Sequence, residues 1–145
     1  MLSHLIGFHP SFSALILRIV LGIIFVAHGS EKLFKHKPKG VSTYFQGIGI
    51  PAPAFFAVVV ILTEFLGGIF LVLGLLTRWA AAALTIEMLV ALIMVRFKTG
   101  LITRTEQDGS AGGYELEFAF SAMAFVLLIL GAGKFSIDWI AFQVW

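Results

Sequence analysis

Four apolar stretches alternate with polar segments along the chain, and each is close in length to a membrane-spanning helix. A helix needs about 20 apolar residues to cross the ~30 Å hydrocarbon core of a bilayer. The segments between them contain lysine, glycine and proline, which favour loops and turns. The predicted helices cover residues 12–33, 53–76, 79–97 and 114–130. The pattern therefore predicts an all-α fold, an integral membrane four-helix bundle, with loops at about 34–52 and 98–113.

The composition agrees with a membrane protein. Of the 145 residues, 59% are hydrophobic and 12% are charged, and the mean hydropathy is +1.01. A soluble domain carries about 25% charged residues. A chain of this length is expected to form a single transmembrane domain, residues 1–145, in contact with the lipid bilayer. The isoelectric point is near 9.2, but the formal charge is only +2 and there is no dense basic stripe, so nucleic acid is not an expected partner.

The basic residues are distributed unevenly between the two ends of the predicted bundle. Cytoplasmic loops of membrane proteins carry an excess of lysine and arginine. One end carries Lys32, Lys35, Lys37, Lys39, Arg96, Lys98 and Arg104, and the other carries Arg78 and Lys134. The distribution predicts that both termini lie on the non-cytoplasmic side of the membrane.

Two acidic residues fall near the centres of predicted spans. Glu64 has about 11 residues on either side within its span, which places it roughly 16 Å from each end. A charge at that depth costs about 3 kcal/mol or more, so such residues usually face the bundle interior and mark a site. Gly67 and Gly68 lie on the same face as Glu64 and would allow a neighbouring helix to come close. Glu87 holds the corresponding central position in the third span.

Estimated depths place five polar residues in a vertical column through the bundle. Arg18 lies near one surface, Glu64 and Glu87 near the middle, and His28 with Glu117 near the opposite surface. If Arg18 pairs with one central acid, the other is expected to hold a proton, because like carboxylates repel in a low dielectric. Two structural alternatives stay open: Arg18 with one acid is a purely structural pair, and His28 only makes a hydrogen bond near the interface.

Several chemistries are excluded by the residues present. The sequence contains no cysteine, so the chain offers no thiolates for an iron–sulfur cluster. A membrane b-type haem needs axial ligands from facing helices, whereas His28 is the one histidine within a predicted span. No metal site and no phosphate-binding loop are predicted.

Three stretches in this order resemble the DoxX family, whose members are small four-helix proteins of the bacterial inner membrane. They are LRIVLGIIFVAHGSEKLF at residues 17–34, TEFLGGIFLVLGLLTR at 63–78 and GAGKFSID at 131–138. The family positions are matched by Arg18, His28, Gly29, Glu64, Gly67, Gly68, Arg78, Glu117, Gly131, Gly133, Ser136 and Asp138. The resemblance implies a multi-pass protein of the inner (plasma) membrane.

The resemblance also implies a redox role. The relatives that gave the family its name resemble subunits of a thiosulfate:quinone oxidoreductase, and others are linked to membrane complexes that handle thiol and peroxide stress. The leading hypothesis is therefore a membrane subunit that binds a quinone and receives electrons from a partner protein, rather than a complete enzyme. The expected proton-transferring (catalytic) residues are Glu64, Glu87 and His28, and the expected quinone-binding residues are Arg18, His28, Glu64 and Glu117.

Two other functions use the same residues. A small-molecule or proton-coupled permease, expected to be a homo-oligomer, would use the central acids as proton carriers. A structural membrane scaffold would use all the polar groups as structural pairs.

Overall fold

The computed structural model describes residues 10–96, 104–105 and 111–142. The long helices are α1 (Pro10–Ser30), α3 (Pro53–Leu73), α4 (Thr77–Ala91) and α5 (Glu115–Leu130). The shorter elements are the π-helical segments η2 (Glu31–His36) and η3 (Leu92–Arg96), helices α2 (Lys37–Gly47) and α6 (Ile137–Phe142), and the antiparallel strands β1 (Arg104–Thr105) and β2 (Ala111–Gly112). The four predicted helices are thus found within a few residues of their expected ends.

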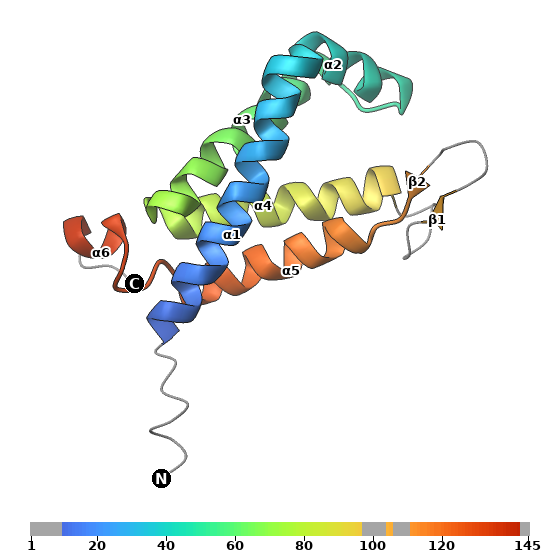
Figure 1. Ribbon diagram of the computed structural model, residues 1–145. Helices are drawn as coiled ribbons and strands as arrows, with labels where there is room; N and C mark the ends of the chain where they lie inside the picture. Colours follow the sequence, from blue (N-terminus) through green and yellow to red (C-terminus); the bar gives the residue numbers. More distant parts are fainter. Residues whose placement is uncertain (1–9, 97–103, 106–110, 143–145) are drawn as a thin grey trace.

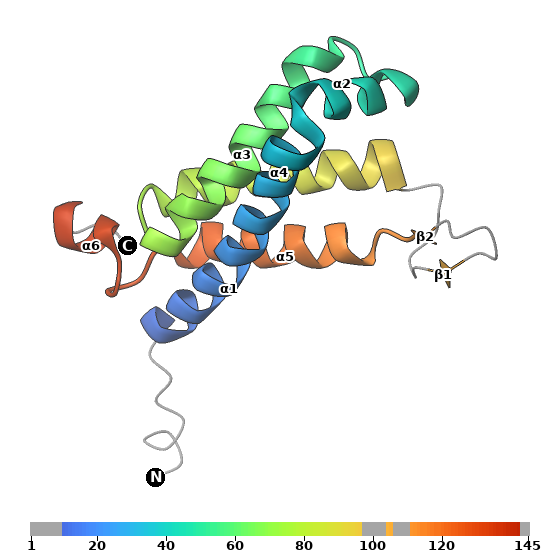
Figure 2. The same ribbon diagram turned by 45° about the horizontal axis from the view of Figure 1, so that its top comes forward.

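The helices form two antiparallel pairs, α1 with α3 and α4 with α5, which cross at an angle (Figure 1 and Figure 2). In the described residues, three helical stretches are long and apolar enough to cross a membrane: Ser11–Gly47, Pro53–Leu73 and Thr77–Met94. Helix α5 is shorter, with 16 residues, and packs along α4. The prediction of an all-α membrane bundle is confirmed, apart from the two-residue strand pair in the segment predicted as a loop.

Glycines allow α1 and α3 to touch backbone to backbone. A Cβ atom added to Gly22 would lie 2.7 Å from the carbonyl oxygen of Gly68, and one added to Gly68 would lie 2.7 Å from the backbone nitrogen of Val26. Farther along α1, a Cβ atom on Gly29 would lie 2.5 Å from the backbone nitrogen of Phe65. Small residues at helix crossings serve this purpose in membranes, where close van der Waals packing replaces the hydrophobic effect.

The contact of Gly29 with Phe65 brings the end of α1 to the middle of α3. The chain continues beyond α1 as η2 and α2, so the prediction of a loop at 34–52 is wrong over most of its length. Val41 and Phe45, which are four residues apart, pack one face of α2 against Ala57 and Ile61 of α3. The lysines, proline and glycine of this segment favoured a loop in the sequence, but this apolar face gives the helix something to bury.

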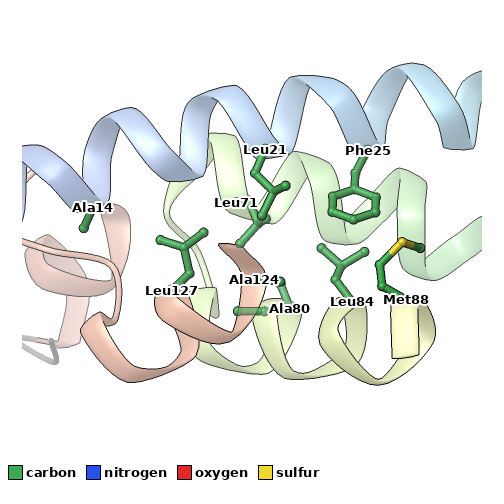
Figure 3. Packing of buried hydrophobic residues seen from close by; sticks show 10 residues of the cluster. Ala14, Leu21, Phe25, Leu71, Ala80, Leu84, Met88, Ala124 and Leu127 are labelled. Atoms are coloured by element: carbon green, nitrogen blue, oxygen red, sulfur yellow. The ribbon is translucent and has the colours of Figure 1, made fainter. Parts of the chain in front are cut away.

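The main core lies where the two helix pairs cross (Figure 3). Leu21 and Phe25 of α1 point toward Leu71 of α3 and Leu84 of α4, and each is at most 1% exposed. Ala124 and Leu127 of α5 close the cluster from the other side. These apolar side chains fill the space between two sets of buried polar groups, one at each end of the helix crossing.

Candidate functional site

A buried ion pair joins the end of the first helical stretch to the middle of α3. Lys32 of η2 places its Nζ atom 2.6 Å from Oε1 of Glu64. The Glu64 side chain is 3% exposed and that of Lys32 is 31% exposed, so the carboxylate is inside and the lysine reaches it from the surface. In the sequence analysis, Lys32 is one of the basic residues whose distribution predicts the membrane orientation, and it is not among the predicted site residues. Its position at the end of a span, within the stretch that resembles DoxX, was the available sign that its long side chain could reach inward.

Glu87 of α4 lies beside this pair. Its carboxylate is within interaction range of both Glu64 and Lys32. Both oxygens of Glu87, and Oε2 of Glu64, are buried and accept no hydrogen bond from a donor in the described part of the chain. Two carboxylates this close can hydrogen-bond to each other only if they share a proton. We call Lys32, Glu64 and Glu87 the acid cluster.

The acid cluster contains two carboxylates and one ammonium group. With both acids ionised it would carry one uncompensated negative charge in a low-dielectric interior, where like charges repel strongly. A proton or a hydrogen-bond donor of a ligand would remove this imbalance. The arrangement can therefore hold and release one proton next to a fixed ion pair, with unsatisfied oxygens available to a ligand.

Arg18 lies elsewhere, and the predicted pairing of Arg18 with a central acid is wrong. Its guanidinium donates hydrogen bonds to the carbonyl oxygens of Leu71, at 3.3 Å, and Val72, at 2.9 Å, and to that of Phe135. The last carbonyls of a helix lack partners within the helix, and a guanidinium with five donors can serve several of them. Arg18 is 2% exposed and secures the C-terminal end of α3.

The closing GAGKFSID stretch completes this arrangement. Asp138 accepts hydrogen bonds from the backbone nitrogens of Leu76, at 2.7 Å, and Thr77, at 2.9 Å, and so caps the start of α4. Gly74 has a φ angle of 67°, and a Cβ atom there would lie 2.6 Å from both Nη1 of Arg18 and Cβ of Ser136. We call Arg18, Gly74, Ser136 and Asp138 the latch. Three of its members match family positions, and the structure gives them a role in the architecture.

His28 and Glu117 lie on neighbouring helices, as their estimated depths suggested. The His28 ring is exposed on α1 and meets Phe120 of α5 edge-on, with ring centroids 6.4 Å apart. Phe120 follows Glu117 by about one helical turn. Of the predicted column, the structure therefore brings Glu64 together with Glu87, places His28 near the helix of Glu117, and moves Arg18 to the latch at the other end.

Three curated relatives resemble the chain over most of its length. An uncharacterized membrane protein of Mycobacterium tuberculosis is 30% identical over 130 residues, covering 87% of this chain and 79% of the relative. A Bacillus subtilis protein named "Putative oxidoreductase CatD" is 33% identical over 94 residues, covering 65% and 67% of the two chains. An uncharacterized protein of Haemophilus influenzae is 32% identical over 139 residues, covering 94% and 96%.

No solved structure matches the chain. The model of the DoxX family matches residues 13–96, which include α2, α3, α4, nearly all of α1 and all three members of the acid cluster. This match spans more than half of the sequence and agrees with the helical membrane fold. The chain belongs to the DoxX family of membrane proteins.

Proposed function

We propose that the chain is the membrane subunit of a quinone-linked redox complex and that its acid cluster takes up and delivers the protons of the reaction. The observation that carries this proposal is Glu87, whose two carboxylate oxygens are buried without a hydrogen-bond donor beside the Lys32–Glu64 ion pair, among the described residues. An unsatisfied buried polar group costs about 1–3 kcal/mol, and more when it is charged. Ionisable groups inside a membrane bundle commonly mark the path of a proton or substrate.

The residues of the cluster suit a quinone headgroup. Its two carbonyl oxygens need hydrogen-bond donors, which the ammonium of Lys32 and a protonated Glu87 can provide. When bound, the quinone would supply two-electron, two-proton redox chemistry. Glu64, fixed by Lys32, would hold the second carboxyl group in place, so that a proton can pass between Glu64 and Glu87 over a short distance.

His28 would connect this pair to water. It is exposed on α1, four residues before Lys32, and an imidazole ring offers one nitrogen that donates and one that accepts a hydrogen bond. Glu117, on the neighbouring α5, would border the quinone on the same side as His28. Arg18 has no place in this proposal, because the carbonyl groups of Leu71, Val72 and Phe135 accept hydrogen bonds from its guanidinium.

Electrons would come from a partner protein. The sequence has no cysteine to ligate an iron–sulfur cluster, and the relative from B. subtilis bears the name of an oxidoreductase. The proposal includes location in the bacterial inner membrane with both termini on the non-cytoplasmic side, because the lysines after α1 are expected to stay in the cytoplasm.

The test is the quinone content of the purified protein. Protein extracted in mild detergent should contain quinone well above the amount carried by its residual lipid, as measured by chromatography of an organic extract. The double variant Glu64→Gln/Glu87→Gln should lose this quinone. Glu115→Gln, at the first turn of α5, is the matched control and should keep it. A wild-type protein with no more quinone than its lipid background would refute the proposal.

A further inference from the structure

The acid cluster has a surface group at one of its ends. Lys32 is partly exposed, and its neighbours Glu31, Lys35 and His36 are exposed polar residues of the same π-helical segment. Glu31 pairs with Lys35 at 2.9 Å and lies 3.8 Å from Nε2 of His36. Such a concentration of charge belongs in water or among lipid headgroups. Lys32 therefore lies at that surface while its ammonium group forms the ion pair with Glu64.

The opposite end of the cluster is closed by apolar side chains on each of its helices. On α1, Leu21 and Phe25 lie between Arg18 of the latch and Lys32. On α3, Leu71 lies between Glu64 and Gly74 of the latch. On α4, Leu84 lies between the start of the helix and Glu87. These four apolar side chains are 0–1% exposed and point toward one another (Figure 3).

The backbone contact between α1 and α3 strengthens this closure. Gly22 and Gly68 meet at the level of the apolar residues, and no side chain could be inserted between their helices there. Beyond them, the latch occupies the end with buried, hydrogen-bonded groups, because Arg18 and Ser136 are each 2% exposed. A proton at Glu64 or Glu87 would have to cross this apolar layer to leave in this direction. The buried hydroxyl groups of Thr85 and Ser121 already donate hydrogen bonds to carbonyl oxygens of their own helices, those of Ala81 and Phe118.

We infer that the acid cluster communicates with water from one side of the membrane only, the side that carries Lys32 and His28, and that Lys32 positions Glu64 at the entrance of this access. This rests on the proposed role of the cluster in proton exchange and adds its direction. Protons consumed or released by the reaction would be exchanged at the lysine-rich end, whatever the sidedness of the electron donor. Lys32 acts here as a positioning residue, because it holds Glu64 at the entrance.

The test uses the natural absence of cysteine in the chain. Lys32→Cys, Lys39→Cys and Lys134→Cys are prepared as single-cysteine variants of the full chain in sealed membrane vesicles of both orientations. A charged, membrane-impermeant thiosulfonate is added from outside. Lys39 and Lys134 are exposed at opposite ends, so their variants report which end faces the reagent. The reagent should label Lys32→Cys in vesicles of the orientation in which it labels Lys39→Cys. It should not label Lys32→Cys in vesicles of the other orientation.

A second variant tests the closed side. Ala81→Cys is a small change at a fully buried position of α4, in the apolar core. It should stay unlabelled in both orientations. Labelling of Ala81→Cys or Lys32→Cys from the side of Lys134 would overturn the inference, and so would the failure of Lys32→Cys to label from either side.

The charge of Lys32 can be restored chemically. Aminoethyl thiosulfonate converts the thiol introduced by Lys32→Cys to a side chain that ends in an ammonium group, close in length to lysine. The reagent should return the thermal midpoint of Lys32→Cys toward that of the wild type, whereas a neutral thiosulfonate of similar size should not. No difference between the two reagents would show that Lys32 does not position the cluster. Neither measurement involves quinone, so the absence of quinone would refute the proposed function without affecting this result.

Discussion

Lys32 and Glu64 are 32 positions apart in the sequence, yet Nζ of the lysine lies 2.6 Å from Oε1 of the acid. The ion pair links a segment just beyond α1 to the centre of α3. It gives the buried carboxylate a cation from the surface, in place of the arginine that the sequence suggested. The predictions below follow from this pair, from Glu87 beside it and from the packing that surrounds them.

Removal of the Lys32 charge should destabilise the protein. Lys32→Met leaves Glu64 buried without its cation, and we expect a loss of about 1–2 kcal/mol, below the usual cost of breaking a fully buried pair because Lys32 is partly exposed. Unfolding in mixed detergent micelles measures this loss. Lys32→Met with Glu64→Gln should recover most of it, while Lys35→Met, at the exposed pair, should leave the stability unchanged. Equal stabilities of Lys32→Met and the wild type would contradict the ion pair.

The two adjacent glycines of α3 should respond differently to the same change. Gly68→Ala places a Cβ atom 2.7 Å from the backbone nitrogen of Val26, so we expect a loss of about 1–3 kcal/mol as α1 is forced away. Gly67→Ala meets Leu84 at 3.5 Å, an ordinary contact, and should be neutral or slightly stabilising because alanine favours a helix. The two variants are compared by thermal unfolding in one detergent. Equal effects on stability would contradict the close contact between α1 and α3 at Gly68.

Arg18 should act independently of Glu64. Arg18→Met removes donors from several carbonyl groups at the end of α3, which should cost about 2–4 kcal/mol. Since Arg18 belongs to the latch and not to the acid cluster, Glu64→Gln should not restore the stability lost in Arg18→Met, and the two effects should add. A double-mutant cycle for Arg18 with Glu64, compared with one for Lys32 with Glu64, decides the matter. Coupling in the first cycle and none in the second would show that Arg18, and not Lys32, is the partner of Glu64.

The acid cluster should contain one protonated carboxyl group at neutral pH. Glu64 and Glu87 face a single ammonium, and repulsion between two ionised carboxylates in the interior favours a shared proton. Infrared difference spectroscopy should show a protonated carboxyl band that disappears in Glu87→Gln and persists in Glu115→Gln. Glu64→Gln should leave the fold intact and abolish quinone-linked proton exchange. The absence of the band from the wild type would favour a purely structural cluster.

The four long helices could be predicted from the sequence, because an apolar segment of membrane length has few other stable conformations. The positions of these helices relative to one another, along and across the membrane, could not be predicted as well. Depth estimates assumed that all helices start at a common plane, and on that basis Arg18 came within reach of Glu64. The contact of Gly29 with Phe65 shifts α1 along α3, so that Arg18 meets the C-terminal end of α3 and Lys32 meets its middle.

The pairing of Glu64 with Glu87 was anticipated because two central acids on facing helices have few other places to go. The identity of their cation was not. A lysine in the last turn of a predicted span is expected to point to the membrane surface, and only the tertiary structure shows that its side chain turns inward. The helical state of α2 was missed for a related reason, since the value of burying Val41 depends on a neighbour, Ile61, that is close only in the folded protein.

The latch has a consequence for the assembly of the chain in the membrane. The stretch that matches the family model ends at residue 96, but the partner that Phe135 provides for Arg18 and the cap that Asp138 provides for α4 lie well beyond it. During synthesis, α1, α3 and α4 would enter the bilayer with these ends still incomplete. Phe135 and Asp138, which are synthesised after these helices, would secure the ends of α3 and α4, and a fragment cut at the end of the matched region would insert without becoming stable.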